Sequence, residues 1–196
     1  YAGSYGWASA GRFHHAQSQV HRFLNCLGGY TKSKNTYSYA AAEVIIPHVL
    51  GGNLMEILTR QTSWQSVCGN TGLMVAFGGL PAFNAQISNG GTGAHIQRTG
   101  VREAAAKGTR FVNLSPRRSD VKHDIDEDWI QLRPNTDVAV MLAMCHTLLA
   151  EGLHDQAFLD RYTTGFDRFS AYLRGASDGT PKTAHWAASI SGMAAE

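Results

Sequence analysis

The chain has 196 residues, of which 43% are apolar and 16% charged, so it can bury a sizeable core and is not expected to be disordered. Its 17 Lys and Arg residues against 15 Asp and Glu residues give a net charge of +2, without a run of like charge. This balance argues against a nucleic-acid binder, which normally shows a basic stripe. No stretch of about 18 apolar residues is present, so no membrane-spanning helix is expected.

Glycine and cysteine positions indicate turns and argue against two kinds of site. The 21 glycines make up about 11% of the chain, against roughly 7% in average proteins. They come in bursts between apolar segments, which indicates turns where the backbone bends sharply or approaches a ligand. Three widely spaced cysteines without a C-x-x-C motif predict buried thiols rather than a disulfide framework, a zinc ribbon or an iron–sulfur site.

The first part of the chain predicts helices separated by glycine pairs. Apolar residues recur at the helical period over residues 10–27, and Gly28 and Gly29 end that segment. Residues 40–50 have a helical composition, but Pro47 would break or kink a helix there. A short strand over residues 44–46 is therefore the alternative.

The second part predicts strands alternating with helices. Short apolar runs at residues 73–77, 110–114 and 128–132 are typical of strands buried on both faces of a parallel sheet. Helices are expected at residues 101–107, 136–149 and 184–190, with a mixed amphipathic stretch at 157–173. In the longest of these helices, one apolar face is expected from Val138, Leu142, Cys145, Leu148 and Leu149.

This alternation predicts an α/β fold with a parallel sheet, in which ligands bind beyond the carboxyl ends of the strands. The expected strand tips, residues 78–81, 115–119 and 133–137, supply glycine, hydroxyl, guanidinium and carboxylate groups. Such groups bind phosphates, ribose hydroxyls and a guanine edge. Neither G-x-G-x-x-G nor a P-loop motif is present, so an ordinary NAD site and a P-loop are both excluded. From composition alone, a nucleotide ligand at these strand tips and the absence of one both remain open.

Three segments together resemble a known family over nearly the whole chain. The first is Gly-Ser-Tyr-Gly-Trp at residues 3–7. The second is Leu-Gly-Gly-Tyr-Thr at residues 27–31 with Tyr-Ser-Tyr-Ala at residues 37–40. The third is Arg-Pro-Asn-Thr-Asp at residues 133–137 and its continuation to residue 166. In order and spacing they resemble the dimethyl sulfoxide reductase family of molybdenum oxidoreductases. Within it, the chain looks like the S- and N-oxide reductases that act on dimethyl sulfoxide, trimethylamine N-oxide or biotin sulfoxide.

The resemblance implies a bis(molybdopterin guanine dinucleotide) molybdenum cofactor with Ser38 as the metal ligand. It also implies that Tyr5 and Trp7 donate hydrogen bonds to the oxo group, and that Trp7 contacts the cofactor. A serine alkoxide is a hard donor that suits high-valent molybdenum, whereas an isolated loop serine is usually a turn or cap residue. Serine in place of cysteine or aspartate favours oxygen-atom transfer from an oxide. Tyr5 favours an S-oxide, because N-oxide reductases typically lack that tyrosine.

The resemblance also implies that the strand tips bind the guanine dinucleotide. The implied residues are Gly78, Gly79, Pro81 and Asn84 at the first tip, Ser115, Pro116, Arg118 and Ser119 at the second, and Pro134, Thr136 and Asp137 at the third. Asp137 is expected to accept hydrogen bonds from guanine, or to act only as a first-turn helix acid. Leu80, Phe83 and Ser115 depart from the residues usual in the family, which leaves the nucleotide contacts open.

The implied fold is a Rossmann-like, mostly parallel sheet flanked by helices and preceded by part of a second α/β cofactor-binding domain. Residues 1–69 would belong to the domain with the metal ligand, residues 70–175 to the dinucleotide-binding domain, and residues 176–196 to the following segment. The expected partners are an S-oxide or N-oxide substrate, an electron-donor protein and the rest of the same polypeptide. A nucleotide-binding module without redox activity and an inactive, cofactor-free segment are the alternatives. Periplasm and cytoplasm both remain open.

Overall fold

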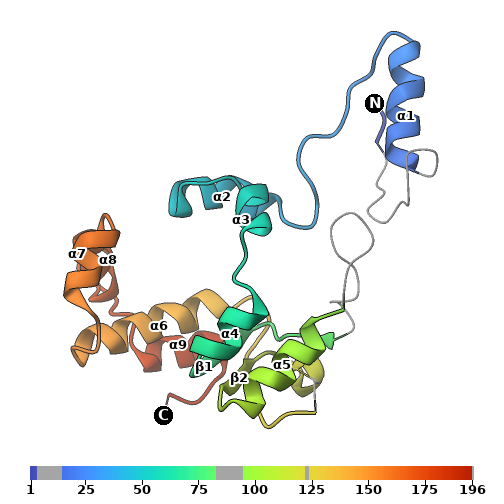
Figure 1. Ribbon diagram of the computed structural model, residues 1–196. Coiled ribbons are helices and arrows are strands. Elements are labelled where there is room, and N and C mark those ends of the chain that lie inside the picture. Colours follow the sequence, from blue (N-terminus) through green and yellow to red (C-terminus); the bar gives the residue numbers. More distant parts are fainter. Residues whose placement is uncertain (4–14, 83–94, 122–123, 196) are drawn as a thin grey trace. The chain divides into compact units, whose positions relative to one another are not determined.

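The computed structural model describes residues 1–3, 15–82, 95–121 and 124–195 (Figure 1). The chain divides into two compact units. The first unit comprises Tyr1–Thr71 and Ala82–Lys107, and the second comprises Gly72–Pro81 and Gly108–Glu196. The segment Ala82–Lys107 therefore leaves the second unit after its first strand and belongs to the first unit.

Helices make up the regular structure that is described in the first unit. They are α1 (Ala16–Cys26), α2 (Ala40–Leu50), α3 (Leu54–Thr59), α4 (Trp64–Asn70) and α5 (Gln97–Ala106). The expected helix at residues 10–27 is α1, and residues 10–14 lie outside the described residues. It begins only at Ala16, because His15 has an extended backbone and its ring accepts a hydrogen bond from the Ser18 amide at 3.2 Å.

The structure decides between helix and strand at residues 40–50. The segment is the helix α2, with Pro47 inside it. A left-handed Gly51, with φ of 77°, ends the helix, which is the conformation that glycine adopts readily at such ends. The alternative strand at residues 44–46 is therefore wrong.

Helices α3 and α4 were not expected from the sequence. Asn53 caps α3 by accepting from the Glu56 amide, and the Glu56 carboxylate accepts from the Asn53 amide, so a reciprocal capping box starts the helix. Ser63 caps α4 by accepting from the Ser66 amide at 3.2 Å. With 6 and 7 residues, these helices are too short to show a clear hydrophobic period.

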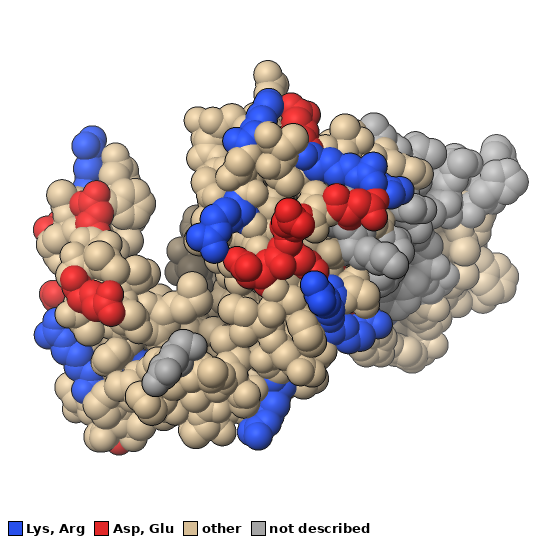
Figure 2. Space-filling model, turned by 90° about the horizontal axis from the view of Figure 1, so that it is seen from below, with Lys and Arg blue, Asp and Glu red and all other residues tan. Residues whose placement is uncertain are grey.

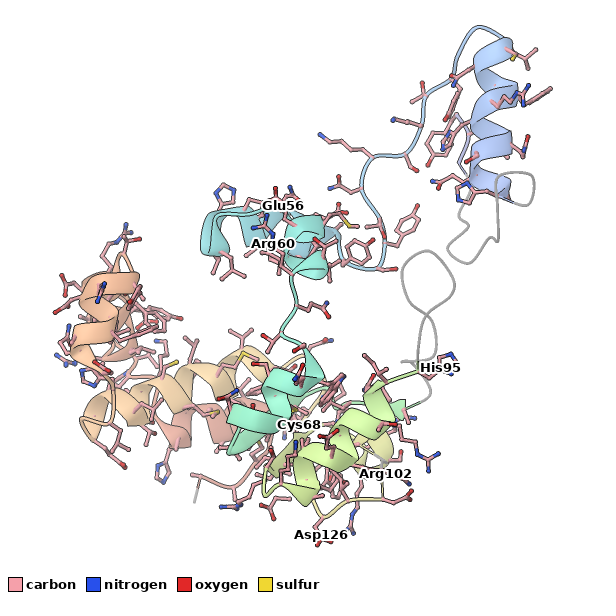
Figure 3. The ribbon with its side chains drawn as sticks, in the orientation of Figure 1. Glu56, Arg60, Cys68, His95, Arg102 and Asp126 are labelled. Carbon is pink, nitrogen blue, oxygen red and sulfur yellow. The ribbon has the colours of Figure 1, made fainter. Side chains whose placement is uncertain are left out.

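Helices α4 and α5 pack closely inside the first unit. Trp64 of α4 lies against Gly100 of α5, where an added Cβ would stand only 2.6 Å from Trp64 Cε3. The buried Cys68 thiol of α4, labelled in Figure 3, donates to the Gly100 carbonyl at 3.5 Å. The prediction of buried thiols is thus confirmed for Cys68 and wrong for Cys26, which is exposed at the end of α1.

The second unit contains a parallel three-stranded sheet. Its strands β1 (Leu73–Phe77), β2 (Arg110–Leu114) and β3 (Asp128–Ile130) lie in the order β1-β2-β3. Val75 pairs with Val112, which in turn pairs with Asp128. The prediction of an α/β fold with a parallel sheet is confirmed. Burial on both faces is not, because Leu73 and Ile130 on the outer strands are exposed and only central β2 is largely buried.

The remaining elements of the second unit are helical. They are the 3-10 helix η3 (Arg118–Val121), α6 (Asp137–Ala150), α7 (Gln156–Tyr162), α8 (Phe166–Leu173) and α9 (Ala184–Ser191). The amphipathic stretch at residues 157–173 thus consists of two helices, separated by a left-handed Gly165 with φ of 81°. In the described part of the chain, no helix is long and apolar enough to cross a membrane.

The core of the second unit joins the sheet to α6. Leu114 of β2, Leu132 and Val140 of α6 form one buried cluster, against which pack Val75, Phe77, Val112 and Met193. A second cluster joins Ala139 and Ala143 of α6 to Ala187 of α9. Small side chains allow these two helices to approach closely.

The predicted apolar face of α6 was wrong. The residues that α6 buries are Ala139, Val140 and Ala143, whereas Val138 is 66% exposed. Three of the expected residues instead line an apolar groove of about 380 Å³ beside α7 and α8, namely Cys145, Leu148 and Leu149. The helix thus contacts neighbours on two sides, which weakens the period that a one-sided helix would show.

A buried lysine joins α8 to α9. The Lys182 side chain is 2% exposed, and its ammonium donates to Asp178 Oδ2 at 2.6 Å and to the Thr180 carbonyl. The ammonium also lies over the rings of Tyr172 and Trp186, 4.4 and 5.3 Å from their centroids. The Lys182 hydrogen bond is the main cause that holds the pKa of Asp178 below its ordinary 3.8.

Candidate functional site

Ser38, the expected metal ligand, lies in an exposed turn directly before α2. Its amide donates to Thr36 Oγ1 at 3.0 Å, and within the described residues its hydroxyl has no hydrogen-bond partner. The position next to the N-terminus of an 11-residue helix favours a negatively charged oxygen. Within the described residues, the fold therefore does not engage this hydroxyl, and it is available to a ligand. Tyr5 and Trp7, the expected donors, lie outside the described residues.

The first residues of the chain lie beside the segment that leads to Ser38. The Ala2 amide donates to the Thr31 carbonyl at 3.1 Å, and Ala2 forms a parallel bridge with Lys32. A polar pocket of about 160 Å³ next to this bridge is lined by Ala2, Gly3, Gln17, His21, Lys32, Ser33 and Asn35. Sequence reasoning did not find this pocket, because its residues come from three separate segments.

The expected nucleotide residues follow the carboxyl ends of the three parallel strands. Because parallel strands end at the same edge of a sheet, the structure brings the three tips to one edge. At the first tip, Gly78 and Gly79 have φ of 80° and 86°, a left-handed conformation that glycine adopts without strain. The Gly78 amide donates to the Leu114 carbonyl at 2.9 Å, which joins this tip to the end of β2. Pro81 is half-buried, and Asn84 lies outside the described residues.

The second tip combines an internal serine with an exposed loop. Ser115 is fully buried, and its hydroxyl donates to the Arg117 carbonyl at 2.6 Å. Trp129 Nε1 donates to the Ser115 carbonyl at 3.1 Å, which ties the tip to β3. Pro116, Arg118 and Ser119 are exposed. In the described part of the chain, the Arg118 guanidinium has no partner, so the tip presents a free cation.

The third tip leads into α6. Thr136 Oγ1 donates to the Arg133 carbonyl at 2.6 Å, and Pro134 is exposed. Asp137 is half-buried in the first turn of α6, and among the described residues its carboxylate has no partner. A free carboxylate there can accept two hydrogen bonds from a ligand and also faces the positive end of the helix dipole. Both roles expected from the sequence remain compatible with this position.

Two further residues at the second tip, Asn113 and Asp120, were missed by sequence reasoning. Asn113 of β2 is fully buried, and its amide nitrogen donates to the Arg118 carbonyl at 3.3 Å. Asp120 is buried and forms an ion pair of 2.7 Å with Arg117. The spacing of three residues between Arg117 and Asp120 was a signal that could have indicated this pair.

Charged side chains of both signs lie on the face that Figure 2 draws, and the described His, Cys, Asp and Glu side chains form no metal-binding group. Figure 2 shows Lys and Arg side chains next to Asp and Glu on the visible face rather than gathered by sign. In the described residues, no group of three or more His, Cys, Asp or Glu side chains could hold a metal ion. Figure 3 labels Glu56, Cys68 and His95, which come from α3, α4 and the segment before α5.

A comparison with protein families shows to which family the chain belongs. The family model described as molybdopterin oxidoreductase matches residues 1–195. The chain belongs to the molybdopterin oxidoreductase family. The resemblance drawn from the three sequence segments is therefore confirmed.

Curated relatives of this molybdopterin oxidoreductase chain are named as S- and N-oxide reductases. The chain is 46% identical over its whole length to the dimethyl sulfoxide/trimethylamine N-oxide reductase of Cereibacter sphaeroides, covering 24% of that protein. It is 40% identical to the biotin sulfoxide reductase of the same organism, covering 26% of it. It is 38% identical to the trimethylamine-N-oxide reductase of Haemophilus influenzae, covering 23%. The chain thus spans about a quarter of the length of these relatives.

Membership of the molybdopterin oxidoreductase family implies a molybdenum–pterin cofactor. Each of the two units, taken by itself, offers groups that suit a part of such a cofactor. Ser38 offers an exposed hydroxyl without a partner, which is a suitable oxygen donor for molybdenum. The sheet edge offers left-handed glycine backbone at Gly78 and Gly79, a free cation at Arg118 and a free carboxylate at Asp137.

Proposed function

We propose that this chain is part of a molybdenum-dependent reductase of S-oxides or N-oxides. Identity of 46% over the whole chain to a relative named as such a reductase carries the proposal. The unpartnered hydroxyl of Ser38, in the Tyr-Ser motif of the second matched segment, supports it. In the reaction, two electrons and two protons convert an oxide to the sulfide or amine and water. Tyr5 favours an S-oxide over an N-oxide.

The bound cofactor would supply the two-electron oxygen-atom transfer, and the chain's residues would hold it and orient the substrate. Ser38 would give up its Oγ proton and bind the metal, and the adjacent N-terminus of α2 stabilises the resulting negative charge. Tyr5 O–H and Trp7 Nε1–H would donate hydrogen bonds to the substrate oxygen. Both donors are carried on rigid rings, so little freedom is lost when they are positioned.

We further propose that the cofactor is the bis(molybdopterin guanine dinucleotide) form, held by a Rossmann-like domain over residues 70–175. The free carboxylate of Asp137 would accept from the guanine N–H groups, which a carboxylate does in pairs. The free guanidinium of Arg118 would bind phosphate, and Gly78 and Gly79 would allow close approach of the backbone. The rest of the polypeptide and an electron-donor protein would complete the enzyme.

Substitution of Ser38 in the full-length protein tests the proposed function. Ser38→Ala is expected to lower the reduction of dimethyl sulfoxide by more than about 100-fold, beyond the range seen when only outer partners of metal ligands are lost. Activity is measured with a reduced viologen dye as electron donor, and molybdenum by plasma mass spectrometry. Ser189→Ala, at an exposed serine of α9, is the matched control and should retain both activity and metal.

Two results would contradict the proposal. One is a wild-type protein without molybdenum. The other is a Ser38→Ala protein that keeps wild-type activity. Guanine nucleotide bound without turnover of any sulfoxide or N-oxide would instead support a binding module that has lost redox chemistry.

A further inference from the structure

The first and second strand tips are interlocked at Gly79 and Asp120. The Leu80 amide donates to the Asp120 carbonyl at 2.8 Å. A Cβ on Gly79 would overlap the Asp120 backbone and stand 2.6 Å from Asp120 Cβ. Gly79 also has φ of 86°, so both the space and the backbone conformation require glycine. The two tips therefore hold one another in place.

The Asp120 carboxylate holds Arg117 against the protein. The Asp120 side chain is 10% exposed and its Oδ1 accepts from Arg117 Nη2 at 2.7 Å, while Arg117 is 66% exposed. The Asp120 amide also donates to the Arg117 carbonyl at 3.2 Å. Arg117 is thus engaged by Asp120, whereas its neighbour Arg118 keeps a guanidinium without a partner among the described residues.

Two buried side chains hold the backbone carbonyls of Arg117 and Arg118 in the second tip. Ser115 Oγ donates to the Arg117 carbonyl, and Asn113 Nδ2 donates to the Arg118 carbonyl. Because C=O and N–H point in opposite directions across a trans peptide, the amides of Arg118 and Ser119 are directed away from these buried side chains. Two outward amides beside a guanidinium without a partner among the described residues form a set of donors that suits an anion.

We propose that Asp120 is a positioning residue for the nucleotide part of the cofactor. It joins the first tip to the second, neutralises its own charge with Arg117, and leaves the outward amides and Arg118 to face a phosphate. The inference rests on the proposed function, since it assumes a guanine dinucleotide at this sheet edge. It assigns Asp120 and Arg117 a role in cofactor retention and none in the chemical step.

The test measures guanine nucleotide and molybdenum in the full-length protein. Asp120→Asn removes the charge that holds Arg117, and Arg117→Gln leaves the Asp120 charge unneutralised next to an anionic ligand. Each is expected to lower guanine nucleotide per folded protein about tenfold after dialysis, the scale seen when partners that orient ligands are removed. Guanine nucleotide is released by acid hydrolysis and quantified by chromatography, on protein that elutes as a folded species with wild-type circular dichroism.

Two comparisons separate positioning from mere stability. Arg117→Lys keeps a cation opposite Asp120 and should restore nucleotide content relative to Arg117→Gln. Asp128→Asn breaks an exposed ion pair, Arg110 Nη2 to Asp128 Oδ2 at 3.0 Å, at the opposite ends of β2 and β3, and should keep full content. If Asp120→Asn does not fold, the two Arg117 variants still test the proposal. The Arg117 side chain is largely exposed, so these variants are expected to fold.

The outcomes distinguish the two proposals. Wild-type protein without guanine nucleotide would overturn the proposed dinucleotide cofactor and, with it, the role of Asp120. Wild-type protein that carries the nucleotide, together with Asp120→Asn and Arg117→Gln proteins that carry as much, would overturn the role of Asp120 alone. Equal losses in Arg117→Gln and Arg117→Lys would also contradict it.

Discussion

Lys182 illustrates how a single residue can organise a connection between helices. An ammonium with 2% exposure is costly to bury unless it is paired, and this one contacts a carboxylate, a carbonyl and two aromatic rings. Its backbone amide also donates to the Leu173 carbonyl at 2.8 Å, which holds the loop onto the end of α8. The contact between Lys182 and the Trp186 ring was not foreseen from the sequence.

This contact predicts a dependence of local stability on pH. Because the folded pKa of Asp178 lies below 3.8, the ionised form stabilises the fold above that value. The stabilisation is lost as the pH falls through 3.8 toward the lower folded pKa. In full-length protein, pulsed hydrogen exchange of peptides over residues 173–187 should therefore show faster opening below about pH 4.

Asp178→Asn is the matching control for this dependence. The amide cannot ionise, so the variant should open more easily at neutral pH and show a flatter pH profile over the same peptides. A variant profile that keeps the wild-type slope between pH 5 and pH 3 would contradict the role of Asp178.

At the scale of elements, strands were predicted most accurately. The bounds of β1 and β2 match the expected residues 73–77 and 110–114, because glycine or proline punctuates both runs. The strand expected at residues 128–132 is shorter, since β3 has only three residues, which pair with Val112–Leu114. Periodicity could not locate α3 and α4, which begin at polar caps and end within two turns.

The candidate site was predictable in its residue types and not in its connections. Ser38, Arg118 and Asp137 were named from their motifs, and all three keep side-chain groups without partners in the described part of the chain, so their roles stay predictions. The contacts of Asn113 and Asp120 depend on which way loop carbonyls turn. That direction is set by tertiary hydrogen bonds and leaves no period or motif in the sequence.

The packing of α4 against α5 predicts an unusual response to alanine. In an exposed helix, replacing glycine by alanine adds about 1 kcal/mol of stability. At Gly100 the new methyl group would overlap the Trp64 ring, and overpacking of this kind costs about 1–3 kcal/mol. Gly100→Ala should therefore accelerate hydrogen exchange in peptides that cover α4 and α5 of the full-length protein.

Gly69→Ala is the control in the same pair of helices. It lies in α4 with no heavy atom within 4 Å of the added Cβ, so the variant should exchange no faster than wild type. Slower exchange in Gly100→Ala than in wild type would show that Trp64 moves aside without cost.

At the scale of the whole molecule, large apolar side chains remain exposed on several described helices. Helix α2 exposes Val44, Ile45, Val49 and Leu50, and α6 exposes Val138, Met141, Met144 and Leu148. Contiguous exposed apolar surface usually marks an interface. Since the chain spans about a quarter of its relatives, other parts of such a polypeptide are the expected cover.

We therefore expect residues 1–196, when produced alone, to associate through these helices. Light scattering after size-exclusion chromatography should show species larger than a monomer, and the dye ANS should fluoresce strongly. Full-length protein at the same molar concentration is the comparison, and each molecule of it should bind less dye. A monodisperse monomer that does not raise the fluorescence of ANS would contradict this expectation.

The contact at Gly79 has a consequence for how such a chain can change over time. The atoms that would meet a side chain at position 79 are the carbonyl oxygen, the carbonyl carbon and the Cβ of Asp120. Every residue except glycine carries those three atoms, so exchanging the side chain at position 120 cannot make room for one at position 79. A substitution of Gly79 would be tolerated only if the backbone of the loop around Asp120 also moved. We therefore expect this position to vary slowly.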